Sequence, residues 1–172
     1  MKMFRFMLAS FITGVVLLTL TVFSTNTNAA GLSYTEQLII KHEGIRLDVY
    51  KDHLGHLTVG VGHLVKPEDN LKYGDAIDAE RVYSFFRSDL VQARDDAKAI
   101  VKGFENLHWK ARVVLINMSF QLGYNRLSKF KKTIAFIEDG DFVAASEEML
   151  DSLWAKQTPK RAKELAYLMS SI

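Results

Sequence analysis

The sequence contains no cysteine, and it has only two prolines and two tryptophans among 172 residues. The lack of cysteine excludes disulfides, thiolate nucleophiles and zinc sites built on cysteine. No sign of charge dominates either, since 22 lysines and arginines face 20 aspartates and glutamates. This balance gives no support to nucleic-acid binding, which a strongly basic chain would indicate. Hydrophobic residues make up 48% of the chain, which is ordinary for a globular protein with one sizeable core.

Charge is also absent from most of the N-terminal segment. Lys2 and Arg5 form a short basic head, and the next charged residue is Glu36. Between them lie an apolar run over residues 6–23 and then a stretch of small and polar residues. A basic head, an apolar run and a small-residue exit are typical of export signals. We therefore predict that residues 1–31 are a signal peptide or signal anchor with a hydrophobic helix, and that residues 32–172 form the folded domain.

The apolar run is intermediate between a signal core and a membrane span. It is longer than the ~7–15 residues of a usual signal core and close to the ~17–25 that cross a bilayer. Its hydrophobicity is diluted by Ser10, Thr13, Gly14, Thr19 and Thr21. We favour a segment that tethers the protein to the host inner membrane and later releases it intact. Two alternatives remain: a signal peptide that is cleaved after Ala29 or Ala30, and a stable membrane anchor. All three place the folded domain outside the cytoplasm, in the periplasm or the extracellular medium.

The rest of the chain changes its hydrophobic period. Residues 35–42 read as a short helix, and residues 46–65 as short strands rich in Val, Thr and Tyr, with glycines at the turns. A long helix opens at Asp78, and helical periodicity continues to the C-terminus. The pattern predicts an α+β fold, in which a long helix joins a small helix-plus-β-hairpin lobe to a larger all-helical lobe. Two lobes joined in this way leave a cleft for an extended polymer.

The helical part carries several start and stop signals. We expect a helix over residues 107–122 that stops at Gly123, a natural helix terminator. We expect further helices that begin at Ser128, at Asp141 and at Thr158. The second of these runs through Trp154, and the third has proline in its first turn.

Two acidic residues and one hydroxyl group stand out in the small lobe. Glu43 falls at the end of the first helix, Asp52 in a turn, and Thr58 on the following strand. Glycoside hydrolysis needs one carboxyl group as proton donor and a second that supports the nucleophile. Thr58 can share a water molecule with Asp52. Such a pair of acids is more often solvated surface, so the spacing alone is a weak indication.

Three segments together carry a more specific signal. Residues 43–63 follow the pattern E-G-x-R-L-x-x-Y-x-D-x-x-G-x-x-T-x-G-x-G-H, and further motifs occur at residues 112–123 and 154–163. In this order they resemble the phage-type lysozymes, or endolysins. The resemblance implies hydrolysis of the β-1,4 bonds between N-acetylmuramic acid and N-acetylglucosamine in peptidoglycan, and hence lysis of a bacterial host. It further implies a monomer without cofactor or metal, which acts with inversion of configuration.

The resemblance also implies roles for individual residues. Glu43 is expected to be the general acid, and Asp52 and Thr58 to orient the attacking water. Arg161 is expected to pair with the acid, although by itself it reads as a charge on a helix face. Leu64 and Phe120 are expected to contact saccharide rings, with Gln121 beside them. For Phe120 the alternative is core packing, and we assign Asn117 and Trp154 to the structure of the second lobe.

Other chemistries fit the sequence less well. His53, His56 and His63 are close in sequence, but tetrahedral zinc needs three or four ligands with fixed geometry, so we predict no metal site. A lytic transglycosylase needs one acid and no water, and the presence of both Asp52 and Thr58 argues against it. A catalytically silent module that binds the cell wall is the third alternative, and the presence of both acids argues against it too.

Overall fold

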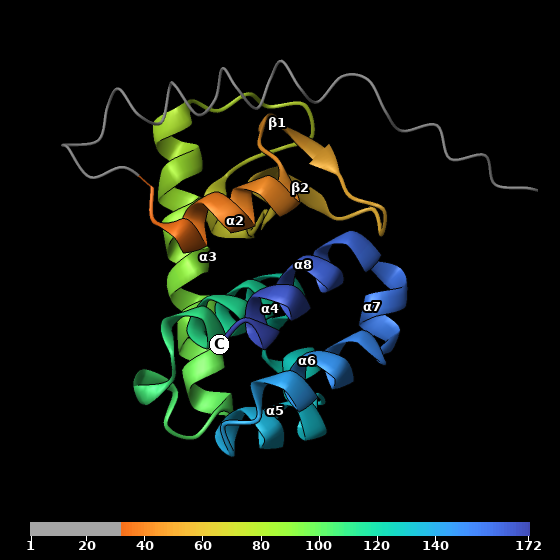
Figure 1. Cartoon of the computed structure of the whole chain (residues 1–172). Helices are drawn as coiled ribbons and strands as arrows, with labels where there is room; N and C mark the ends of the chain where they lie inside the picture. Colours follow the sequence, from red (N-terminus) through yellow and green to blue (C-terminus); the bar gives the residue numbers. More distant parts are fainter. Residues whose placement is uncertain (1–31) are drawn as a thin grey trace, which may run out of the picture. The chain divides into compact units, whose positions relative to one another are not determined.

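The computed structural model describes residues 32–172 (Figure 1). The predicted export segment lies outside these residues, so its nature stays a prediction. Within the described range, no helix is both long enough and apolar enough to cross a membrane. The described residues divide into two units. Unit 1 comprises Leu32 and Glu43–Tyr83, and unit 2 comprises Ser33–His42 and Ser84–Ile172.

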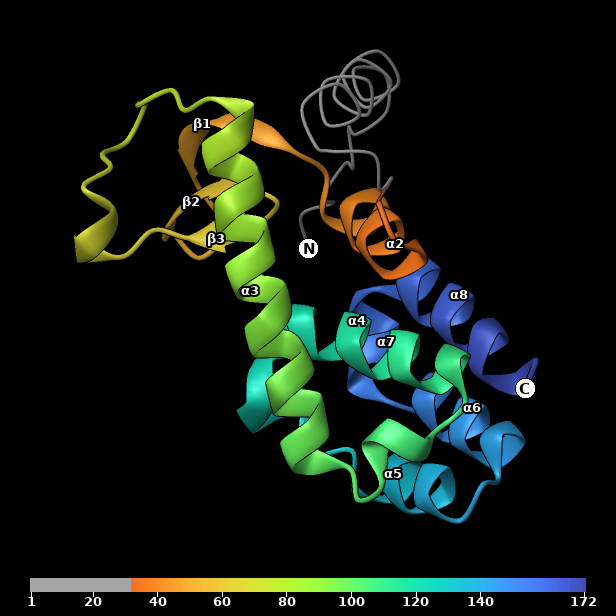
Figure 2. The same ribbon diagram turned by 90° about the vertical axis from the view of Figure 1, so that its left-hand side faces the viewer.

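Unit 1 is built on a three-stranded antiparallel sheet of order β1-β2-β3. The strands are β1 (Arg46–Lys51), β2 (Leu57–Gly60) and β3 (His63–Leu64). Thr58 on β2 pairs with Tyr50 on one side and with Leu64 on the other. The sheet lies beside the first turns of the long helix α3 (Ala79–Ile100), which begins in this unit (Figure 2). Val49 and Val59 are almost fully buried and form part of the hydrophobic core.

The connection from β3 to α3 folds back along the outer edge of β1. It contains the short 3-10 helix η1 (Pro67–Asp69). Backbone hydrogen bonds then join it to β1, from Val49 N to Asp75 O at 2.8 Å and from Ile77 N to Leu47 O at 2.7 Å. The free edge of β1 is thereby paired, which lowers the risk of association through that edge.

Unit 2 is helical, with a single large hydrophobic cluster. Its elements are most of α2 (Tyr34–Glu43), the rest of α3, η2 (Phe104–Asn106), α4 (Trp109–Leu127), α5 (Lys131–Glu138), α6 (Phe142–Leu150), α7 (Leu153–Gln157) and α8 (Pro159–Ser170). Helix α6 packs against both α5 and α8. Met118 and Met149 are fully buried in the cluster, and Leu115 is 1% exposed. The α+β fold predicted from the sequence is confirmed.

The predicted helix ends are partly confirmed. The carboxylates of Asp78 and Asp141 accept backbone N–H bonds at the starts of α3 and α6, at 2.8 and 3.0 Å. Gly123 does interrupt its helix, with φ 67° and ψ 170°, but the chain resumes helical turns as far as Leu127. The helix that begins at Trp109 therefore breaks at Gly123 as predicted, and a second short helical stretch follows it.

Three other helix signals behave differently from the prediction. Ser128 does not begin a helix, because its hydroxyl donates to Asn125 O at the end of α4. The helix from Asp141 does not reach Trp154, because Ser152 caps a separate helix α7 by accepting from Ala155 N at 3.0 Å. Thr158 does precede Pro159 at the start of α8, but its hydroxyl donates to Trp154 O instead of capping α8.

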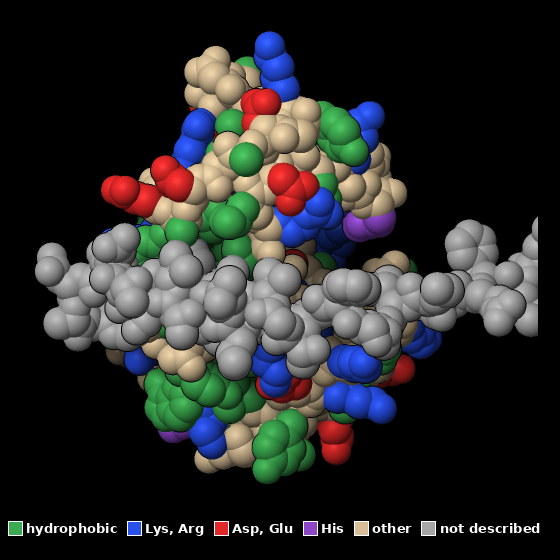
Figure 3. Space-filling view, turned by 90° about the horizontal axis from the view of Figure 1, so that it is seen from above, with side chains coloured by type: hydrophobic (Ala, Val, Ile, Leu, Met, Phe, Trp, Pro, Cys, Tyr) green, Lys and Arg blue, Asp and Glu red, His purple; other side chains and the backbone are tan. Residues whose placement is uncertain are grey.

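Charges of both signs are interspersed on the surface. Lysine and arginine side chains lie among aspartates and glutamates over the described residues on the face that Figure 3 shows.

Candidate active site

Asp52 lies in the turn that follows β1, and the backbone holds its carboxylate. One carboxylate oxygen accepts the N–H groups of Leu54 and His56, each at 2.8 Å. The Asp52 N–H in turn donates to His56 O at 2.9 Å, which closes the hairpin. Partial burial acts to raise the pKa of Asp52, but the N–H groups of His56 and Leu54 outweigh it and hold this pKa below its usual value. Asp52 is thus an ionised acceptor near neutral pH.

Thr58 lies on β2 opposite this turn, and its side chain is buried. Its hydroxyl donates to His56 O at 3.3 Å. The His56 ring nitrogen Nδ1 lies 3.4 Å from Asp52 Oδ2. His56 therefore links the carboxylate of Asp52 to the hydroxyl of Thr58 within one turn of the hairpin.

Glu43 is the last residue of α2 and belongs to the same unit as the hairpin. A Cβ atom placed on Gly62 would lie 3.7 Å from Glu43 Oε2, so the glycine leaves room for the carboxylate beside the β2–β3 turn. Burial raises the pKa of Tyr50, Arg46 lowers it, and the negative charges of Glu43 and Asp52 raise it again. Both acids are therefore close enough to act on the same phenol group.

Arg46 completes this part of the site. Its guanidinium lies over the ring of Tyr50, 4.2 Å from the ring centre, and forms an ion pair with Asp48. Cations in this position are attracted by the negative face of the ring. The motif of residues 43–63 thus brings Glu43, Arg46, Tyr50 and Asp52 close together in unit 1.

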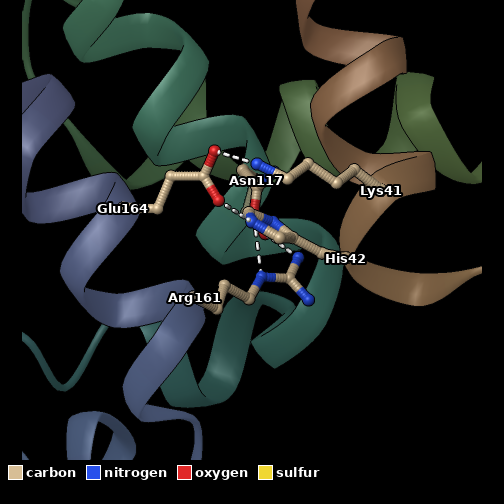
Figure 4. Close-up of polar contacts among 5 residues, drawn as sticks. All are labelled: Lys41, His42, Asn117, Arg161 and Glu164. Atoms are coloured by element: carbon tan, nitrogen blue, oxygen red, sulfur yellow. Dashed lines mark hydrogen bonds and ion pairs between the residues drawn. The ribbon is translucent and has the colours of Figure 1, made fainter. Parts of the chain in front are cut away.

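Arg161 is buried in unit 2, at the start of α8 (Figure 4). Its Nε donates to Asn117 Oδ1 at 2.8 Å, and its Nη2 donates to Asn117 O at 2.9 Å. The side chain is therefore fixed from α4 and is not a solvated charge on a helix face. Its expected role toward Glu43 stays a prediction.

The expected saccharide contacts occupy different environments. Leu64 on β3 is exposed, whereas Phe120 is half-buried and packs edge-on against Phe86 at 5.8 Å between ring centres. Gln121 accepts a hydrogen bond from Trp154 Nε1 at 2.8 Å. Core packing thus accounts for part of the surroundings of Phe120, and the saccharide contacts stay predictions.

Comparison with known proteins decides the family. The sequence profile of the phage lysozymes matches residues 40–168, which is most of the chain. The chain belongs to the phage lysozyme family. It is therefore a lysozyme, a glycoside hydrolase.

Individual relatives agree with this membership. The lysozyme is 29% identical over 156 residues to "Probable T4-type lysozyme 2" of Dictyostelium discoideum, covering 78% of this chain and 92% of that protein. It is 28% identical over 124 residues to "Endolysin" of Acyrthosiphon pisum secondary endosymbiont phage 1, covering 72% and 80% of the two chains. It is also 28% identical over 125 residues to "Peptidoglycan hydrolase gp36" of Pseudomonas phage phiKMV, covering 73% of this chain and 14% of that protein.

His63 of the lysozyme lies in a buried polar pair. His63 Nε2 lies 3.2 Å from Asp69 Oδ2, and both side chains are nearly buried. Among residues 32–172 there is no group of three His, Cys, Asp or Glu side chains that could hold a metal ion. His63 is thus a hydrogen-bonding partner of Asp69.

Sequence reasoning missed two participants in this lysozyme. The sequence offers His56 only as a possible metal ligand, whereas in the structure it joins Asp52 to Thr58. His42 received no role, although it makes two polar contacts inside unit 2. A histidine directly before the predicted acid was the available signal, but its partners lie far away in sequence.

Proposed function

We propose that this lysozyme hydrolyses the β-1,4 bonds between N-acetylmuramic acid and N-acetylglucosamine in peptidoglycan, as a monomer and with inversion of configuration. The observation that carries the proposal is the hairpin in which an ionised Asp52 and the Thr58 hydroxyl are both bonded to His56. An acceptor carboxylate beside a hydroxyl is what a water nucleophile needs for orientation. Two of its relatives, named as an endolysin and a peptidoglycan hydrolase, support the same substrate.

In the proposed reaction, Glu43 is the acid and Asp52 accepts the proton of the attacking water. Glu43 gives its proton to the glycosidic oxygen as the bond from that oxygen to the anomeric carbon breaks. A water molecule held by Asp52 and Thr58 attacks the anomeric carbon from the opposite face, and its proton passes to Asp52. The products are two shorter glycan strands, one with a new reducing end. Exchange with solvent then removes the proton from Asp52 and restores the proton of Glu43.

The products test this function directly. Digestion of purified glycan strands should give reducing-end muramic acid, and NMR during the first turnovers should show the α-anomer released from the β-linked substrate. If 1,6-anhydro ends were the main product, the enzyme would be a transglycosylase. If the β-anomer appeared first, inversion would be wrong.

We further propose that residues 1–31 export the lysozyme and tether it to the host inner membrane before release, which times host lysis. The support is the uncharged run over residues 6–23 behind Lys2 and Arg5, since positive residues stay on the cytoplasmic side. A variant with Thr13→Leu, Gly14→Leu and Thr19→Leu should stay in the membrane and delay lysis. Each added apolar group raises the free energy needed to leave the bilayer.

Cell fractionation followed by mass spectrometry tests the release. Full-length protein should appear in the periplasm of the wild type and remain in the membrane fraction of the leucine variant. A soluble form that lacks residues up to Ala29 or Ala30 would instead mean a cleaved signal.

A further inference from the structure

A cluster of polar side chains holds the last turn of α2 inside unit 2 (Figure 4). Lys41 Nζ donates to Glu164 Oε1 at 2.6 Å. His42 places Nε2 at 3.1 Å from Glu164 Oε2 and Nδ1 at 3.3 Å from Asn117 Oδ1. The side chain of His42 is only 7% exposed. The reaction proposed above assigns no role to this histidine.

Arg161 fixes which end of the Asn117 amide faces His42. A guanidinium has only N–H donors and cannot accept a hydrogen bond. Its Nε lies 2.8 Å from Asn117 Oδ1, and reversing the amide would bring two donors together at that distance. Asn117 Nδ2 has no acceptor among the described residues, so Arg161, and not the amide's own donors, imposes this orientation. The atom that faces His42 Nδ1 is therefore an oxygen.

Both ring nitrogens of His42 thus face acceptors. A neutral imidazole has one N–H and one lone pair, so one of its nitrogens would point a lone pair at an oxygen. The acceptor on the Nε2 side is a carboxylate. Desolvation acts to raise the pKa of Glu164, but the hydrogen bonds from Lys41 and His42 outweigh it and hold that pKa below its usual range. The arrangement is satisfied only when His42 carries both ring protons.

We propose that His42, as an imidazolium bonded to Glu164 and Asn117, is a positioning residue for Glu43. The proposal rests on the acid role of Glu43 proposed above. Glu43 directly follows His42 and is the last residue of α2, so whatever holds this turn also limits the position of the Glu43 backbone. A cation in the last turn also interacts favourably with the helix dipole.

The charged surroundings of His42 predict a dependence on pH. Lys41 and Glu43 flank it on α2, and Glu164 faces it from α8. The uncharged Asn117 faces it from α4 and is itself bonded to the charged Arg161 of α8. When the ring loses its second proton, one of its two hydrogen bonds is replaced by a contact between a lone pair and an oxygen. The turn that carries Glu43 is then held less firmly, and misplacement of a catalytic group by about 1 Å can cost about a hundredfold in rate.

Nitrogen-15 NMR of the histidine rings tests the protonation without any activity assay. At pH 7.5 an ordinary histidine, with a pKa of about 6.5, is about 90% neutral. His42 should carry protons on both ring nitrogens at this pH. A neutral His42 at pH 7.5, with one protonated nitrogen, would overturn the proposal.

Kinetics on soluble glycan fragments test the positioning. His42→Gln should lower kcat about tenfold to a hundredfold with KM changed less than about threefold. The wild-type kcat should fall at the pH where NMR records the loss of the second ring proton, and this fall should be absent in the variant. His108→Asn is the control, because His108 is exposed and Asn can still accept from Lys110 N at the start of α4.

Glu164→Gln provides a second variant that does not depend on the folding of the first. The introduced amide can donate to Nε2, so a neutral His42 satisfies both contacts. Its second ring proton should then be lost below pH 7.5, while kcat stays within about threefold of the wild type. If Glu43→Gln is inactive but His42→Gln keeps the wild-type kcat and pH profile, the positioning role of His42 is refuted and the acid role of Glu43 stands. If Glu43→Gln is fully active, the proposed acid is wrong, whatever the ring nitrogens show.

Discussion

Breaking the ion pair between His63 and Asp69 should strongly destabilise unit 1. The two side chains are 5% and 10% exposed, with Nε2 and Oδ2 3.2 Å apart. The same carboxylate oxygen accepts Lys66 N–H at 2.6 Å at the start of η1. Burial acts to raise the pKa of Asp69, but the hydrogen bonds from Lys66 and His63 outweigh it and lower this pKa below its usual value.

The magnitude follows from this burial. Removing one partner of a buried ion pair costs about 3–5 kcal/mol, because the other charge is left without compensation. In Asp69→Asn the amide oxygen can still accept from Lys66 N–H, so we expect about 3 kcal/mol, at the low end of this range. His63→Gln should destabilise by a similar amount, and the double variant by less than the sum of the two.

The pH dependence of the free energy of unfolding provides a second check on the contribution of Asp69. Because the pKa of Asp69 is lower in the folded protein, its stabilisation is fully present above the unfolded value of about 3.9 and is lost as the pH falls through the folded value. Urea unfolding followed by hydrogen exchange of the backbone amides of β1 and β2 at pH 7 and at pH 3 measures this. The reasoning would be refuted if Asp69→Asn cost under about 1 kcal/mol at pH 7, or if its deficit were the same at both pH values.

Three further predictions concern stability and can be checked by the same urea unfolding. Met118→Ala should cost about 3 kcal/mol, because the side chain is fully buried in the hydrophobic cluster, and a cost below about 1 kcal/mol would contradict that packing. Gly60→Ala should cost about 1 kcal/mol more than the control Gly55→Ala. Both glycines have positive φ, but only at Gly60 would an added Cβ meet another side chain, 3.3 Å from Val82 Cγ1. Equal costs for the two variants would show that this contact is harmless. Ser33→Ala should cost about 1 kcal/mol through loss of the capping box with Glu36 at the start of α2, and no change would mean that this end is already frayed.

The elements of the fold were predictable because their signals are local. The change from period two to helical period near Pro67 separates the strands from the later helices, and Asp78 and Asp141 cap helices as their sequence context indicates. The errors occurred where one local signal had two outcomes. A serine hydroxyl before a helical run can cap the next helix, as Ser152 does, or bond back to a preceding carbonyl, as Ser128 does.

The candidate site was predictable only in part, because only some of its contacts join residues that are close in sequence. Glu43, Asp52 and Thr58 fall within one short stretch, and the hairpin that presents two of them is itself a local structure. The partners of His42 lie 75 and 122 positions further along the chain, at Asn117 and Glu164. Such pairings depend on how the helices of unit 2 pack, and the periodicity of a single sequence does not specify that.

The most direct test of the proposed function is the turnover of Glu43→Gln on purified glycan strands. Glutamine keeps the size of the side chain but cannot give a proton to the glycosidic oxygen. Because general acid catalysis contributes about 10²–10⁴-fold, kcat should fall by about 10³-fold, while the urea midpoint stays near that of the wild type. A variant that is equally stable and still turns over at close to the wild-type rate would contradict the assignment of Glu43 as the acid.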